Sequence, residues 1–242
     1  MRGRKAVVEE PVINFIRNLF CSSLGKKYLM AGSGALMFLF VVGHMAGNLQ
    51  IFLGREAINR YGHFLQSNVE ILWPVRLGLL GIIAIHIWSA TKLTLENRAA
   101  RPLAYAQWEP TAATYASRTM MWSGVVVAVF IIYHLLHYTV MVQCVNLTGT
   151  DFRPLMDNER RHDIYGMMVL GFSRWPVAAF YILGVGLLCL HLSHGISAMF
   201  QSLGWKKHGY GEILDRGAKW FAALIFAGYI SVPTAILIKL IQ

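Results

Sequence analysis

The chain has 242 residues, of which 56% are hydrophobic and 14% are charged, and it carries a formal net charge of +10. Soluble domains carry about 25% charged residues, so this composition excludes an ordinary soluble protein and indicates one whose solvent is lipid. The basic residues lie in short segments between long apolar runs, which favours orientation signals and contact with membrane lipid over nucleic-acid binding. Cys21, Cys144 and Cys189 form no CxxC or CxxCH motif for zinc, an iron–sulfur cluster or covalent haem.

Residues 1–27 form the first segment, and they are not expected to be a signal peptide. Charged residues and Pro11 interrupt them before an apolar core can form. One face of the following stretch is apolar, with Arg17 on another face, which predicts a short helix lying in the membrane interface. The apolar face consists of Val12, Phe15, Ile16 and Leu19.

Five long apolar runs follow, and each is long enough to cross a bilayer core of about 30 Å as a helix of roughly 20 residues. They cover about residues 28–52, 72–95, 119–143, 175–200 and 220–240. The runs are continuous rather than alternating, which favours helices over a β-barrel. We recognise no low-complexity tract and no convincing internal repeat. The predicted fold is therefore an all-α integral membrane bundle of five transmembrane helices, with residues 1–242 forming a single membrane domain.

The distribution of basic residues predicts the orientation of this bundle. Segments on the side of the N-terminus carry twice as many lysines and arginines as the opposite loops, which places the N-terminus in the cytoplasm. Tryptophans mark the starts of several spans, as interfacial anchors do. They are Trp73, Trp122, Trp175 and Trp220.

Six of the nine histidines fall inside predicted spans: His44, His86, His134, His137, His191 and His194. An ionisable side chain is costly in hydrocarbon and needs a partner there. For one histidine alone, a hydrogen bond to a neighbouring helix explains its presence as well as a function does.

Depth groups four of these histidines into two pairs. His44 and His134 lie on outward-running spans, roughly 22–24 Å from their inner ends, whereas His86 and His191 lie in the inner half. Opposed imidazoles at one level of a bundle suit a haem iron with two axial nitrogens. The pattern predicts two haems at two depths and an electron path across the membrane.

Depth leaves open which histidine of a close couple is the ligand. His137 and His194 each lie three residues beyond a proposed ligand, one turn nearer a surface. They are expected to hydrogen-bond haem propionates or to line a quinone pocket. The remaining histidines are predicted to lie in solvated loops: His63, His162 and His208.

Around these histidines the sequence resembles a known family, the single-subunit two-haem cytochrome b anchors of bacterial succinate dehydrogenases and fumarate reductases. The motifs are FLFVVGHMAGNLQ around His44, IIAIHIWSA around His86, VFIIYHLLHY around His134, LLCLHLSHG around His191, and YGHF before the second span. A histidine motif in each of four successive spans, with none in the fifth, is the specific part of the resemblance.

The resemblance implies two haem b groups ligated by His44 with His134 and by His86 with His191, in preference to His137 and His194. It further implies a flavoprotein and an iron–sulfur subunit on the cytoplasmic face of a bacterial inner membrane. The protein would then be the membrane subunit of a succinate:quinone oxidoreductase of the tricarboxylic acid cycle. Electrons from succinate would pass through the inner and outer haems to a quinone, expected to be menaquinone, and fumarate reductases run the reverse reaction.

The family places its quinone near the outer haem, and four residues are candidates by position: Gln50, His63, Glu70 and Trp73. Glu70 is placed to exchange quinone protons, although a solvated loop carboxylate explains it equally well.

Other functions remain open from the residues alone. Haem b anchors of other respiratory oxidoreductases use different ligand layouts, and the bc-type cytochrome places two ligands on each of two helices. A proton-coupled transporter with intramembrane histidines should carry mid-span carboxylates or helix breaks. Spans one to four carry neither, and the fifth has only Pro233. A purely structural anchor would leave four buried histidines unexplained.

Overall fold

The computed structural model describes residues 11–100, 115–206 and 209–242. Within these ranges the regular structure is helical apart from one isolated bridge between Met156 and His162, and five helices are long and apolar enough to cross a membrane. The predicted all-α membrane bundle is thus confirmed. The expectations for residues 1–10 and for His208 lie outside the described residues.

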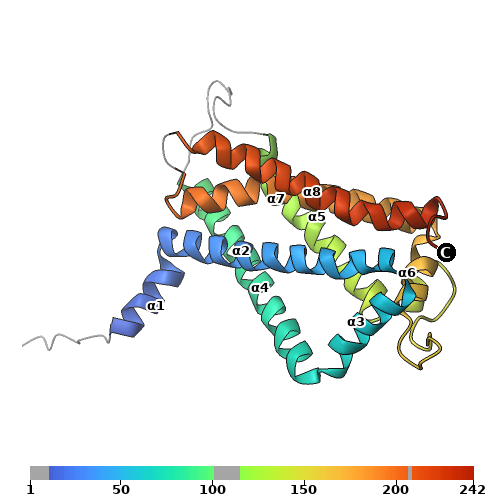
Figure 1. Cartoon of the computed structure of the whole chain (residues 1–242). Coiled ribbons are helices and arrows are strands. Elements are labelled where there is room, and N and C mark those ends of the chain that lie inside the picture. Colours follow the sequence, from blue (N-terminus) through green and yellow to red (C-terminus); the bar gives the residue numbers. More distant parts are fainter. Residues whose placement is uncertain (1–10, 101–114, 207–208) are drawn as a thin grey trace, which may run out of the picture.

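The five long helices are α2 (Ser23–Asn48), α4 (Val69–Ala99), α5 (Tyr115–Tyr138), α7 (Trp175–Ser202) and α8 (Gly211–Leu237). Helices α7 and α8 lie along α2, while α4 crosses α2 and α5 packs on α7 (Figure 1). We call the end of the bundle where α2 begins the N-side, and the opposite end, which holds Gln242, the C-side.

Several helix ends differ from the ends of the apolar runs, as α8 and α5 illustrate. Helix α8 begins at Gly211, well before residue 220, because its charged first turns continue the helix beyond the apolar stretch. Helix α5 ends at Tyr138 rather than near 143, and Met141 then adopts a left-handed backbone conformation with φ of 58°. Hydropathy marks the lipid-facing length of a helix and not the length of its hydrogen-bonded backbone.

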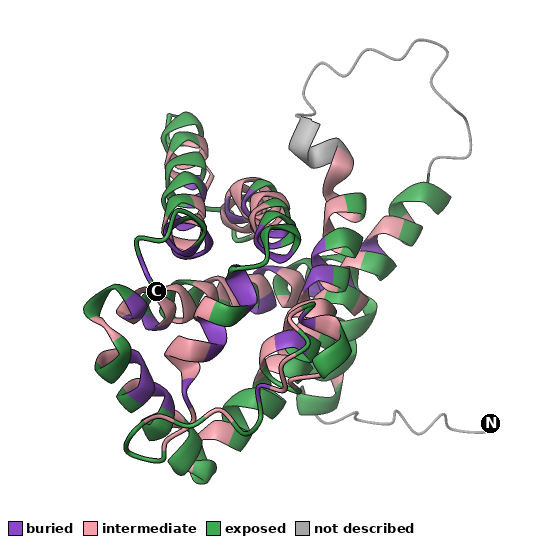
Figure 2. Cartoon of the chain, turned by 90° about the vertical axis from the view of Figure 1, so that its right-hand side faces the viewer, coloured by how far each residue is buried: buried purple, intermediate pink, exposed green. Residues whose placement is uncertain are grey.

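The tightest packing joins α7 to α8. Ala178 on α7 and Ile225 on α8 are 0% and 1% exposed. Tyr229 of α8 also donates a hydrogen bond of 2.7 Å to the carbonyl oxygen of Val41 on α2. By contrast, no residue in the most apolar stretch of α4 is buried. Figure 2 shows buried residues, in purple, as short stretches among exposed ones, in green, along the helices.

Two glycines allow other helices to approach closely. A methyl group at Gly184 of α7 would overlap the ring of Phe130 on α5, and one at Gly228 of α8 would overlap the sulfur of Met45 on α2. Small residues at such crossings bring helix backbones together in membranes.

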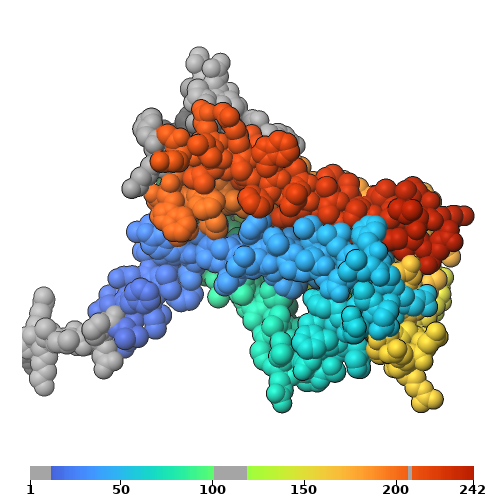
Figure 3. Space-filling model, in the orientation of Figure 1, coloured from blue at the N-terminus to red at the C-terminus, as the bar shows by residue number. Residues whose placement is uncertain are grey.

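The C-side of the bundle carries short helices where the sequence predicted loops. They are α3 (Arg55–Ser67) and α6 (Ile164–Phe172). The 3₁₀ helix η1 (Leu49–Leu53) lies at the end of the first predicted span, and a 3₁₀ turn, η2, covers Gln143–Val145. His63 lies in α3, so its predicted position in a loop is wrong. Helix α3 forms because Ile58 and Gly62 pack inward against α6. Figure 3 shows the junction of α3 and α4 projecting from the side of the bundle.

A buried polar network fixes α3 to the loop before α6. Arg161 donates to Glu56 at 2.6 Å and to Asp157 at 2.7 Å, while Asn59, which is fully buried, donates to Asp163 at 2.9 Å. Burial opposes ionisation of Asp157, but the hydrogen bonds from Arg161 and Asn59 outweigh it and lower the pKa of this carboxyl to about 2. Hydrogen bonds from Arg161 also lower the pKa of Glu56.

The N-side begins with α1 (Pro11–Cys21), the short helix predicted from its apolar face. Val12, Phe15 and Ile16 of that face are exposed. Nearby, the buried ammonium of Lys26 on α2 forms an ion pair with Glu96 at the end of α4. This pair ties the first two long helices together at the N-side.

Candidate functional site

The structure brings His44 of α2 and His134 of α5 together in the C-side half of the bundle. Their ring centroids are 5.7 Å apart, and the ring planes cross at 78°. Phe40 stacks on His44 and Phe130 stacks on His134, at centroid distances of 5.3 and 6.3 Å. We call these two histidines the C-side pair.

A second pair lies in the N-side half, formed by His86 of α4 and His191 of α7. Their ring centroids are 6.4 Å apart, and the planes cross at 65°. We call these histidines the N-side pair. The pairs join α2 to α5 and α4 to α7, so all four helices that carry a predicted ligand take part.

The separations within both pairs suit one metal ion between two imidazoles. Metal–imidazole bonds of about 2 Å and about 1.1 Å from each nitrogen to its ring centre give roughly 6.2 Å between centres. The observed 5.7 and 6.4 Å lie on either side of this value. Among the described residues, no three or more His, Cys, Asp or Glu side chains are grouped to hold a metal ion. Two histidines without further ligands fit a metal whose other ligands come from a macrocycle, so the residues present fit haem.

Two serines orient the N-side pair. The hydroxyl of Ser33 on α2 lies 3.1 Å from Nδ1 of His86 and donates to the carbonyl oxygen of Leu29 at 2.7 Å. Ser123 on α5 repeats this arrangement, with its hydroxyl 3.1 Å from Nδ1 of His191. Because each hydroxyl proton goes to a backbone carbonyl, each Nδ1–H donates to its serine. Nε2 then remains the free basic nitrogen of each ring.

A glycine follows each serine and lies against the same histidine. A methyl group at Gly34 would lie 3.5 Å from Cε1 of His86, and one at Gly124 would lie 3.6 Å from Cε1 of His191. These two contacts therefore share a short local sequence pattern. A Ser-Gly step precedes a C-side histidine at the same spacing in α2 and α5. Ser33 and Ser123 stand eleven residues before His44 and His134. Sequence interpretation missed both serines, and this repeated spacing is the signal that identifies them.

His137 and His194 lie outside both pairs. His137 is fully buried, stacks on Tyr138 at 3.9 Å, and has its Nδ1 3.0 Å from the hydroxyl of Tyr181. His194, on α7, interacts electrostatically with Lys206 and with Asp215 of α8. His162 lies in a loop as predicted but is half-buried.

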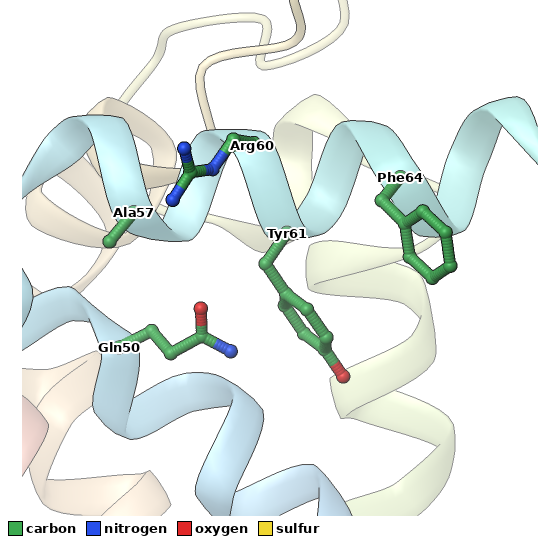
Figure 4. A pocket seen from close by; sticks show the side chains of 5 residues that line it. All are labelled: Gln50, Ala57, Arg60, Tyr61 and Phe64. Carbon is green, nitrogen blue, oxygen red and sulfur yellow. The ribbon is translucent and has the colours of Figure 1, made fainter.

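One of the four quinone candidates lines a cavity on the C-side. Gln50 of η1 faces a space of about 360 Å³ together with residues of α3 (Figure 4). The other lining residues are Ala57, Arg60, Tyr61 and Phe64.

The remaining three candidates lie elsewhere. His63, Glu70 and Trp73 are exposed and do not line this cavity, and Trp73 instead packs under the guanidinium of Arg76. Residue order placed them near the C-side pair, but His63 is exposed on α3, and Glu70 and Trp73 lie in the exposed first turns of α4.

Arg60 and Tyr61 were missed in the sequence. A methyl group at Gly47 would lie 2.8 Å from the ring of Tyr61, so that ring fits closely over α2 just after His44. The glycine three residues beyond His44 is the signal that a side chain from another element packs there. The cavity is therefore close to the C-side pair.

Residues 94–232, more than half of the chain, match the family described as succinate dehydrogenase/fumarate reductase transmembrane subunit. This range contains His134 and His191, one member of each pair. Neither the comparison with curated proteins nor that with solved structures gives a match.

Proposed function

Because the chain belongs to the succinate dehydrogenase/fumarate reductase transmembrane subunit family, we propose that it carries electrons between an iron–sulfur subunit and quinone. The observation that supports this most strongly is the presence of two imidazole pairs, with ring centroids 5.7 and 6.4 Å apart, in two halves of one membrane bundle. The whole chain, residues 1–242, acts in this proposal as one membrane domain.

The proposed cofactors are two haem b groups, one held by each pair. His44 with His134 would hold one of them through two imidazole nitrogens, and His86 with His191 would hold the other in the same way. When bound, haem b supplies reversible one-electron chemistry at its iron. Ser33 and Ser123 hold the N-side rings so that Nε2 is available, and the aromatic rings of Phe40 and Phe130 restrict the C-side rings.

The proposed orientation puts the N-side in the cytoplasm of a bacterial inner membrane. The bias of basic residues toward that side of the sequence supports it. The flavoprotein and iron–sulfur subunits would bind there, next to the N-side pair. Electrons from succinate, oxidised on the partner, would reach the N-side pair first and the C-side pair second.

The cavity between η1 and α3 is the proposed quinone site, with menaquinone as the expected substrate. The side chains of Gln50, Arg60 and Tyr61 extend toward the same space in Figure 4. Amide, guanidinium and phenol groups all carry donors for a quinone carbonyl oxygen. We propose His63, Glu70 and Trp73 only for the approach to this cavity.

The deciding experiment is haem quantitation and an optical spectrum on the complex purified with its partner subunits, before and after succinate. The proposal expects two haem b per chain, both low-spin and both reduced by succinate. The His44→Ala and His86→Ala variants should each retain one haem, and the two should retain different ones. A wild-type complex with no haem, or with one, would contradict the proposal.

A further inference from the structure

A line of three polar rings runs from the C-side pair toward the C-side surface. The hydroxyl oxygen of Tyr181 on α7 lies 3.4 Å from Nδ1 of His134 and 3.0 Å from Nδ1 of His137. Tyr181 and His137 are 6% and 0% exposed, so bulk water does not compete for these bonds. Both histidines belong to α5, and the tyrosine bridges them from the neighbouring helix.

The protons of this line have one consistent arrangement once Nε2 of His134 binds a metal. Nδ1 of His134 must then carry a proton, which it donates to the tyrosine oxygen. Tyr181 has a single proton, and it donates this to Nδ1 of His137. The proton of His137 is therefore on Nε2. Each bond strengthens the next, because a hydroxyl that donates is a better acceptor.

The line ends at two buried polar groups that lie against α6. Nε2 of His137 and the hydroxyl of Tyr138 are buried without a hydrogen-bond partner among the described residues. A methyl group at Gly171 of α6 would lie 3.3 Å from that Nε2 and still closer to the tyrosine oxygen. Because Gly171 has no side chain, the hydroxyl of Tyr138 and Nε2 of His137 can lie close against α6.

We propose that Tyr181 and His137 are positioning residues that orient His134 and increase its donor strength toward the metal. The inference rests on the proposed haem function. A hydrogen bond accepted from the distal N–H of a ligating imidazole raises the basicity of the ligand. A more basic ligand stabilises the oxidised iron, so the Tyr181–His137 line lowers the midpoint potential at the C-side pair and leaves the N-side pair unaffected.

The test is spectroelectrochemical titration of the intact complex carrying Tyr181→Phe. We expect both haems to remain bound, one midpoint potential to rise, and the other to stay at the wild-type value. The redox-difference infrared spectrum should lose a tyrosine C–O band. His137→Leu should raise the same potential by less, and His137→Gln, whose amide oxygen can accept from Tyr181, should restore it toward the wild type.

Tyr133→Phe is the matched control. Tyr133 belongs to the same aromatic cluster, 5.9 Å from Tyr181 between centroids, but its hydroxyl donates to the carbonyl oxygen of Val145. This variant should leave both potentials unchanged. Two bound haems with unaltered potentials in Tyr181→Phe, or an equal rise in Tyr133→Phe, would overturn the inference and leave the proposed function intact. Absence of haem from the wild-type complex would instead overturn the proposed function.

Discussion

The two histidine pairs have similar separations but different supports. Each N-side histidine is held in the same way by a serine on a neighbouring helix, His86 by Ser33 and His191 by Ser123. On the C-side, His134 lies beside Tyr181, ten residues before His191. The residue ten positions before His86 is Arg76, which is exposed and lies over Trp73.

This difference shows where the two halves of the bundle diverge. The two histidines of the N-side pair have matching serine contacts, whereas the surroundings of the C-side pair differ between its two histidines. At the C-side the start of α4 is exposed, and α3 brings a cavity close to the bundle. In our proposal electrons enter at the N-side half, where the two supports match, and the diffusible quinone binds at the C-side half, where they differ.

The largest expected effect distinguishes the C-side ligand from its neighbour. His134→Ala should abolish binding of one haem, because it removes one of the two imidazole nitrogens that hold this haem in our proposal. His137→Ala should keep two haems, because its ring lies behind Tyr181. Haem quantitation on both variants checks this, and loss of a haem in His137→Ala alone would reverse the assignment.

The cavity provides the next effect. Arg60→Gln should raise KM for quinone about tenfold or more with haem content unchanged, because a hydrogen bond from a charged donor contributes about 1.5–3 kcal/mol. Steady-state kinetics with a soluble quinone measures the change. Gln66→Ala, at an exposed position of the same helix that does not line the cavity, is the control, and a comparable rise in that variant would argue against the cavity.

A smaller effect is expected at the N-side. Ser33→Ala and Ser123→Ala should each raise one haem potential, the one that Tyr181→Phe leaves unchanged. Loss of about 1 kcal/mol corresponds to roughly 40 mV for one electron. Redox titration of the single variants measures this shift. Unchanged potentials in both variants would show that the two serines do not influence the N-side pair.

The last prediction concerns stability in acid and depends on Asp157, in the polar network that joins α3 to the loop before α6; at neutral pH its effect is the smallest of the four. The folded-state pKa of Asp157, about 2, lies below the unfolded value, which is near 3.9. Its contribution to stability is therefore complete above the unfolded pKa and is lost as pH falls through about 2. The thermal midpoint of the complex should fall in this acid range, and Asp157→Asn should flatten that part of the profile. An unchanged acid profile in this variant would exclude Asp157 as the source.

Much of the fold follows from the sequence because lipid imposes long apolar runs. The helix ends do not, since polar turns such as that of Glu212 continue a helix beyond the hydrocarbon. Helix α3 was also missed, because its mixed composition resembles a loop until Ile58 and Gly62 pack against α6.

The site was predicted in part for a similar reason. Counting residues along each span predicts the depth of a histidine, so the pairings of His44 and His86 could be proposed from the sequence. Contacts such as Ser33 with His86 or Tyr181 with His134 join helices far apart in sequence, and depth does not predict the direction of a side chain. The repeated Ser-Gly spacing could have indicated the serines, whereas nothing local marks Tyr181.

The crossed ring planes have a magnetic consequence. If each pair holds a haem as proposed, imidazole planes at 78° and 65° would act on perpendicular iron d orbitals almost equally, and those orbitals would stay close in energy. Oxidised low-spin iron in such surroundings gives an electron paramagnetic resonance spectrum dominated by one broad signal at high g. The more nearly perpendicular C-side rings should give the more axial of the two signals, which would identify each centre without any substitution.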